Sequence, residues 1–175
     1  MTADTTAARL PPPHRWLRIL LIVVTVAEAL GTLTSLPGIM LFFTENHPTA
    51  LLRFAQGLLS VKLALAPFVA VPGFIFAWKG RLREATLALA ALLLLTWLLD
   101  DTTTFAIHGF EFAGGLVGIT LFARYFVFPL LALAGGWLAL KDRRPWLAAL
   151  LVSAPTIFYW IGVAIFTVTI MIYGF

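Results

Sequence analysis

The chain has 175 residues, of which 61% are hydrophobic and 11% are charged, and its mean hydropathy is +0.98. Soluble domains contain about 45–50% apolar and about 25% charged residues, so this composition excludes a soluble globular domain, a disordered chain and a nucleic-acid-binding domain. The formal net charge of +4 is typical of a membrane protein whose basic residues gather in the loops on one side.

The N-terminal part of the chain combines a polar tail with a first apolar segment. Residues 1–15 are polar, include three consecutive prolines and predict a disordered cytoplasmic tail. The apolar segment Trp16–Leu36 follows, and we expect it to end at Pro37. The stretch Ala27–Ala29 resembles a signal-peptidase site, but the apolar run continues beyond it, which favours an uncleaved first helix.

Four more apolar segments follow along the chain. Each is long enough to cross about 30 Å of hydrocarbon at about 1.5 Å per residue. The sequence therefore predicts an all-α, polytopic membrane protein with five transmembrane helices in one domain over residues 16–175. The four segments are Leu51–Trp78, Ala85–Ile107, Leu116–Leu140 and Trp146–Tyr173.

Basic residues predict the orientation of the five segments. The loops Pro37–Ala50 and His108–Gly115, on one side of a five-span threading, contain no lysine or arginine. Lysine and arginine are enriched in cytoplasmic loops, so we expect an inner (plasma) membrane protein with a cytoplasmic N-terminus and an external C-terminus. The nine basic residues on the opposite side are Arg9, Arg15, Arg18, Lys79, Arg81, Arg83, Lys141, Arg143 and Arg144.

The second and fourth segments resemble each other at a gapless offset of 62 residues. Each has a basic residue within the segment, then a proline, then a glycine, and then a lysine just after the end of the segment. Two interpretations stay open: a duplicated hairpin, which gives one leading helix plus two parallel-repeat hairpins, or a chance match between Ala- and Leu-rich spans. The matched pairs are Lys62/Arg124, Pro67/Pro129, Gly73/Gly135 and Lys79/Lys141.

Small residues recur at four-residue spacing in the fourth segment. Such spacing allows two membrane helices to approach closely. We therefore expect a tight helix contact there, with another span or with another subunit. The residues are Ala132, Gly135, Gly136 and Ala139.

Five ionisable residues lie within the predicted spans: Glu28, Lys62, Asp100, Asp101 and Arg124. Each costs about 2.5–3.5 kcal/mol at the bilayer centre, so such residues usually face the bundle interior and pair. Lys62, Asp100 and Arg124 each lie about 16 residues, or roughly 24 Å, from the predicted inner end of their segment. We therefore expect the two bases to pair with the two aspartates, with Glu28 nearer the midplane.

Two interpretations of these charges are open. They line an outward-biased polar cavity that binds or moves a small anionic or zwitterionic solute, a lipid headgroup or protons, or they form salt bridges that lock the bundle. Pro67 and Pro129 lie just inward of the two bases, and each frees the carbonyl four residues earlier, at Leu63 and Tyr125. We expect these carbonyls to hydrate the cavity or to bind a cation.

The predicted outer loops carry a candidate metal site. His108 and Glu111 have i, i+3 spacing, and Glu45 and His47 add a second carboxylate and imidazole from the other loop. These donors suit a divalent metal, whereas the alternative is a set of solvated loop residues. Gly109 weakens the expectation that His108 and Glu111 share one regular helix, and the sequence has no metalloprotease motif. Both observations favour solvated loop residues.

The rest of the chemistry is limited by what the sequence omits. It has no cysteine and none of its three serines sits in a nucleophile elbow, so we expect no catalytic residue and no cofactor. Expected partners are membrane lipids and a homo-oligomer or larger membrane complex, without nucleic acid. Two rival functions remain: a non-catalytic accessory subunit that uses its uncharged last segment as an interface, and a metal-dependent membrane enzyme acting at the outer face.

Overall fold

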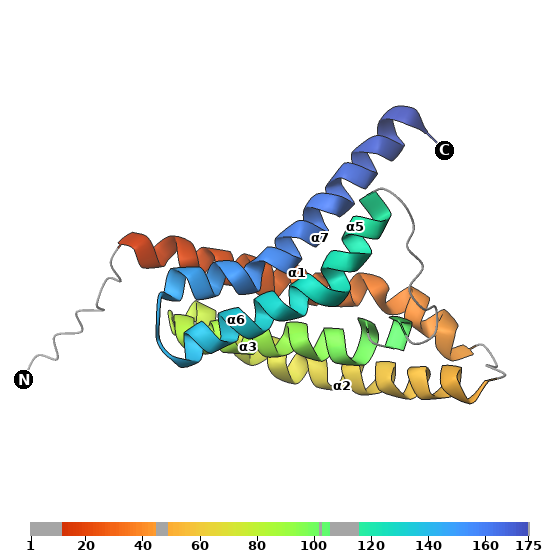
Figure 1. The fold of residues 1–175 in the computed structure, drawn as a ribbon, viewed down its shortest axis with the longest axis horizontal. Coiled ribbons are helices and arrows are strands. Elements are labelled where there is room, and N and C mark those ends of the chain that lie inside the picture. Colours follow the sequence, from red (N-terminus) through yellow and green to blue (C-terminus); the bar gives the residue numbers. More distant parts are fainter. Residues whose placement is uncertain (1–11, 45–48, 102, 106–115, 175) are drawn as a thin grey trace, which may run out of the picture.

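In the computed structural model, the described residues are 12–44, 49–101, 103–105 and 116–174, without the side chains of 12–14, 32–44 and 116–117. Every element in these ranges is helical (Figure 1). Two short elements, η1 and η2, are π-helices. The elements are α1 (Pro12–Thr44), α2 (Ala50–Trp78), α3 (Leu82–Thr96), η1 (Trp97–Asp101), α5 (Leu116–Phe122), η2 (Ala123–Val127), α6 (Phe128–Leu140) and α7 (Pro145–Tyr173).

The helices have the length and composition of membrane spans. Among the residues that the structure describes, four helices are long and apolar enough to cross a bilayer: Ala50–Trp78, Leu82–Phe105, Gly118–Leu140 and Pro145–Tyr173. α1, with 33 residues, contains the first predicted span. The predicted fold class, an all-helical membrane protein, is therefore confirmed. Its membrane and its orientation stay predictions.

The first helix is longer than predicted at both ends. It continues past Pro37 to Thr44, so the predicted stop at Pro37 was wrong. A proline removes one hydrogen bond and crowds the preceding turn, which bends a helix without having to end it. Helix α1 also begins at Pro12, where a proline's missing N–H group would have had no helical partner. The helix thus includes the last residues of the predicted tail.

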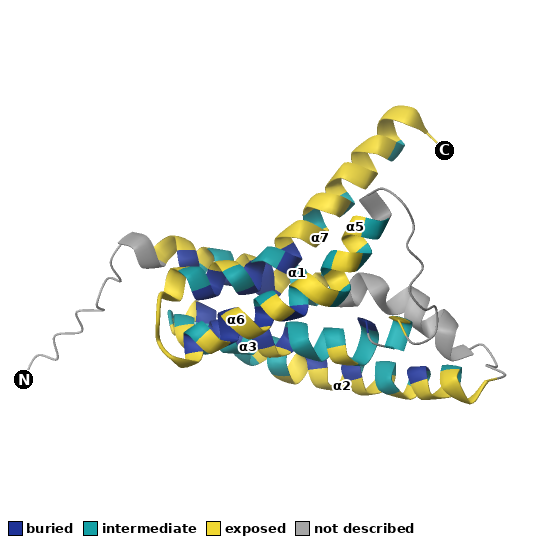
Figure 2. Cartoon of the chain, viewed as in Figure 1, coloured by how far each residue is buried: buried dark blue, intermediate teal, exposed yellow. Residues whose placement is uncertain are grey.

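Helix α3 is the central element of the bundle and contacts α1, α2, α6 and α7. Helices α1, α2 and α3 run side by side, whereas α5 and the C-terminal part of α7 lean away from them (Figure 1). The buried core lies at the end of the bundle that holds the short α2–α3 and α6–α7 connections (Figure 2). Its members are Leu17, Leu21, Val24, Ala77, Ala85, Leu89, Ala90, Ala149 and Val152.

Two consecutive glycines place α6 against its neighbours. A Cβ atom added at Gly135 would lie 2.4 Å from Cγ2 of Val152 and 2.9 Å from the carbonyl oxygen of Ala148. A Cβ atom added at Gly136 would lie 3.4 Å from Cβ of Ala90. Gly135 therefore faces α7 and Gly136 faces α3. The predicted close contact is confirmed, and it is made with other spans of the same chain.

The C-terminal ends of α2 and α6 have the same hydrogen-bonding pattern. The N–H group of Arg81 donates to the carbonyl of Phe76 at 2.8 Å, and that of Arg143 donates to the carbonyl of Leu138 at 3.0 Å. In each case the preceding residue has a positive φ angle, as in a Schellman motif. However, the π-helix before α6 has no counterpart in α2, which is α-helical throughout. The internal duplication stays a prediction.

Candidate functional site

Two π-helical segments face each other and carry most of the intramembrane charge. η1 contains Asp100 and Asp101, η2 contains Arg124, and the two segments are in contact. π-Helices are rare and occur mostly as single turns, often at functional sites. The backbone hydrogen bonds of a π-helix span five residues instead of four. The angle about the helix axis between successive side chains is therefore smaller than in an α-helix. This geometry helps both aspartates to reach the same group of bases.

Four side chains form one continuous ion-paired group, which we call the charge cluster: Lys62, Asp100, Asp101 and Arg124. Lys62 Nζ donates to Asp100 Oδ2 at 2.7 Å. Arg124 Nε donates to Asp101 Oδ1 at 2.5 Å, and Nη2 of the same guanidinium also pairs with Asp101. Arg124 Nη2 lies 3.6 Å from Asp100 Oδ2. The predicted pairing is confirmed: Asp101 pairs with Arg124, whereas Asp100 pairs closely with Lys62 and at a longer distance with Arg124.

The charge cluster has a buried side and an open side. The side chains of Asp101 and Lys62 are 7% and 10% exposed, whereas those of Asp100 and Arg124 are 27% and 44% exposed. The remaining terminal nitrogen of the Arg124 guanidinium, Nη1, has no partner among the residues that the structure describes. The open side is therefore a guanidinium edge that is already oriented by an aspartate behind it.

Glu28 joins α1 to α7 next to the charge cluster. The hydroxyl of Thr156 donates to Glu28 Oε1 at 2.5 Å. Lys62 and Asp101 are close enough to act electrostatically on the Glu28 carboxyl group. The five charged residues predicted to gather in the bundle are thus brought together by α1, α2, η1 and η2.

Thr156 was missed because the last segment carries no charge, and an uncharged segment was considered as an interface with another subunit. The structure corrects this for the first half of α7, where Ala149, Val152, Ser153 and Thr156 are buried. Ser153 and Thr156 are three residues apart and so share a face of the helix. That pair of polar residues was the available signal. Beyond Thr156 the helix is mostly exposed.

The carbonyl of Tyr125, which was predicted to hydrate the cavity or to bind a cation, accepts a hydrogen bond from a side chain of η1. Because Pro129 has no N–H group, it donates nothing to this carbonyl. The indole Nε1 of Trp97 donates to the Tyr125 carbonyl instead, at 2.9 Å. The N–H group of Phe128 reaches five residues back, to the carbonyl of Ala123, as a π-helix requires. A side chain from η1 therefore occupies the position that the proline vacates.

The predicted metal ligands Glu45, His47, His108 and Glu111 lie outside the described residues, so the metal site stays a prediction. Within the part of the chain that the structure describes, no group of three histidine, aspartate or glutamate residues could hold a metal ion.

The chemistry that the charge cluster offers is ion pairing and proton exchange. A guanidinium presents a planar fork of donors that matches a carboxylate or a phosphate. An incoming anion at the Arg124 edge would share the guanidinium with Asp101. The adjacent carboxylates are groups that can accept a proton when the local balance of charge changes.

The chain was compared with protein families, curated proteins and solved structures, and no significant match was found in any of the three. Fold alone does not imply function, so the function is inferred from the chemistry of the charge cluster.

Proposed function

We propose that the charge cluster binds a small anionic or zwitterionic group at the Arg124 edge and takes up a proton as it does so. The observation that supports this proposal is the state of Arg124, which is held by Asp101 yet remains 44% exposed. A guanidinium that only locked two helices together would be expected to use its full donor set inside the bundle. In this structure Asp101 orients the Arg124 guanidinium, and no other described residue covers its outer edge.

Proton uptake follows from the balance of charge. The two bases and the two aspartates of the cluster neutralise each other, so an added anion leaves an excess negative charge. An uncompensated charge in a buried site costs several kcal/mol. Protonation of one carboxyl group removes the excess, and Asp100, Asp101 and Glu28 are the candidate acceptors. Binding is therefore expected to strengthen as pH falls.

The proposal is tested by titrating the purified chain, in nanodiscs of uncharged lipid, with inorganic phosphate, acetate and phosphocholine. Calorimetry in two buffers of different ionisation enthalpy measures both the affinity and the number of protons taken up. We expect at least one probe to bind with net proton uptake. Arg124→Gln should weaken binding of that probe by about tenfold or more, because one charge-assisted hydrogen bond is worth about 1.5–3 kcal/mol.

Arg53→Gln is the matched control, since Arg53 is an exposed base at the start of α2 and outside the charge cluster. It should bind the probe as the unmodified chain does. If the cluster only locks the bundle, Arg124→Gln will lower the thermal stability while none of the probes binds to or stabilises the unmodified chain. That result would exclude the proposed ligand site.

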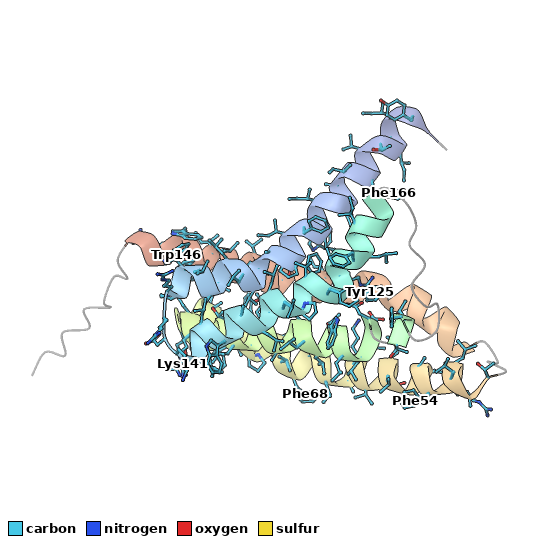
Figure 3. The ribbon with its side chains drawn as sticks, viewed as in Figure 1. Phe54, Phe68, Tyr125, Lys141, Trp146 and Phe166 are labelled. Carbon is cyan, nitrogen blue, oxygen red and sulfur yellow. The ribbon has the colours of Figure 1, made fainter. Side chains whose placement is uncertain are left out.

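A second candidate function is that of an accessory subunit in a larger membrane complex. The specific observation in its favour is the C-terminal half of α7, which leans away from the bundle and includes the exposed side chains Ile165, Phe166 and Met171 (Figure 3). Purification from native membranes in mild detergent discriminates the two candidates. A stoichiometric partner that is lost when Phe166→Ser and Met171→Ser are introduced supports the subunit, and a chain that purifies alone argues against it.

A further inference from the structure

One end of the bundle, which we call the basic end, concentrates the positive charge of the protein. It carries eight basic side chains against the two acidic side chains Glu84 and Asp142, an excess of six charges. The whole chain has a net charge of only +4, so the remainder of the chain is net negative. The basic side chains are Arg15, Arg18, Lys79, Arg81, Arg83, Lys141, Arg143 and Arg144.

Two contacts bring the three basic segments together. The guanidinium of Arg18 lies 5.7 Å from the ring centroid of Trp78, which joins the start of α1 to the end of α2. Arg83 Nη2 donates to the carbonyl of Leu140 at 3.1 Å, which joins the start of α3 to the end of α6. The basic end is therefore one continuous surface.

Tryptophan side chains place this surface at a membrane interface. Four of the six tryptophans lie at the basic end, and all four are exposed: Trp16, Trp78, Trp137 and Trp146. Exposed tryptophans favour the headgroup level of a bilayer. Lys141 and Trp146 lie at the same end of the bundle (Figure 3). The basic side chains are thus at the depth of lipid phosphates and next to exposed apolar helix surface.

The α6–α7 connection has three exposed basic side chains within four consecutive positions, and none of them forms an ion pair with a described residue. Arg81 is already paired with Glu84 at 2.6 Å, and Arg83 is bound to a carbonyl. By contrast, Arg143 and Arg144 are exposed and form no ion pair with any described residue. Lys141 is also exposed, and its Nζ lies 5.0 Å from the ring centroid of Trp137.

We propose that the basic end binds the phosphodiester headgroups of anionic phospholipids, with Lys141, Arg143 and Arg144 as its main contacts. Each basic residue near an anionic bilayer surface strengthens the attraction by about fivefold. Arginine adds a donor fork that fits phosphate oxygens. A lipid is favoured over a soluble phosphate because its acyl chains lie against the exposed tryptophans and helix surfaces around the same site. This site is separate from the charge cluster and does not depend on the ligand proposed there.

The test uses the full chain in an uncharged detergent, with phosphatidylglycerol and phosphatidylcholine of identical acyl chains as probes. Native mass spectrometry and thermal unfolding measure bound lipid and stabilisation. We expect phosphatidylglycerol to bind about tenfold or more tightly than phosphatidylcholine, and this preference to shrink as salt screens the charges. Soluble glycerol phosphate should have little effect, because it lacks acyl chains.

Variants locate the site. The triple change K141Q/R143Q/R144Q should weaken phosphatidylglycerol binding by about tenfold or more and so remove most of its preference over phosphatidylcholine. The charge-preserving triple K141R/R143K/R144K should retain most of the preference. R53Q removes one exposed charge elsewhere and should leave it unchanged.

Several results would overturn the inference. Equal binding of the two lipids by the unmodified chain excludes an anionic-lipid site, and this comparison needs no variant to fold. A preference that survives K141Q/R143Q/R144Q excludes the α6–α7 connection as the site. Stronger binding of a soluble polyglutamate peptide than of phosphatidylglycerol would indicate an acidic protein partner in place of lipid.

Discussion

Arg124 on one π-helical segment binds Asp101 on another, through Nε and Nη2 of its guanidinium, while 44% of its side chain stays exposed. Asp101 itself is almost fully buried, so the pair has a buried acid and an accessible base. Asp100 links this pair to Lys62. Its Oδ2 atom lies 3.6 Å from Arg124 Nη2 and 2.7 Å from Lys62 Nζ. The four charges of the cluster therefore sum to zero, and the outer edge of the Arg124 guanidinium faces away from Asp101.

We predict that removing Asp100 destabilises the fold more than removing Asp100 together with Lys62. Asp100→Asn leaves the buried ammonium of Lys62 uncompensated, at a cost of about 3–5 kcal/mol for a fully desolvated pair and less here because Asp100 is partly exposed. The double change Asp100→Asn with Lys62→Met should recover part of that loss. Unfolding in mixed micelles measures both. A double variant no more stable than the single one contradicts the pairing.

We predict that Gly135→Ala destabilises the bundle by about 1–3 kcal/mol, the range for overpacking a close contact. The added Cβ atom would lie 2.4 Å from Val152 and 2.9 Å from a backbone oxygen of α7, which has little freedom to move. Gly57→Ala is the matched control, because no atom lies within 4 Å of its added Cβ. Equal stability of the two variants in thermal unfolding would show that α6 and α7 do not pack as described.

We predict that Thr156→Val destabilises the α1–α7 contact by about 1–3 kcal/mol, because the Glu28 carboxyl group loses a donor in a buried site. Thr156→Ser keeps the hydroxyl and should retain most of the stability. Thr167→Val is the control, since that exposed hydroxyl donates only to the Val163 carbonyl of its own helix. A loss as large for Thr167→Val as for Thr156→Val would argue against a specific bond to Glu28.

We predict that Trp97→Phe costs about 1–3 kcal/mol, because the Tyr125 carbonyl loses its indole donor while Pro129 offers no N–H group to replace it. The exposed Trp137→Phe change is the control. Unfolding measurements compare the two variants. If the stability of Trp97→Phe matches that of Trp137→Phe, the bridge between the two π-helices does not hold them together.

We predict from the positive-inside pattern that the basic end is cytoplasmic and that the C-terminus is external. The start of α1 and the end of α7 lie toward opposite ends of the longest axis, as five crossings would require (Figure 1). Reporter fusions after Arg83 and after Phe175 measure the two sides directly. Fusions that report the same side would exclude the five-span topology.

The sequence alone determined the class of fold and the approximate spans. Lipid offers the backbone no hydrogen bonds, so apolar segments of sufficient length must be helical wherever they cross a membrane. Because the rise per residue is constant, counting from the ends of the segments also placed Lys62, Asp100 and Arg124 at one depth. Their pairing could be predicted because unpaired charges are costly at that depth.

Only the tertiary structure decided which groups meet at that depth. Depth does not specify the rotation of each helix about its axis, and that rotation is set by packing such as that of Gly135 against α7. The π-helical turns shift the direction of Asp100, Asp101 and Arg124 in a way that no apolar periodicity encodes. The partners of Glu28 and of the Tyr125 carbonyl, Thr156 and Trp97, lie on segments distant in the sequence and became identifiable once packing had fixed those rotations.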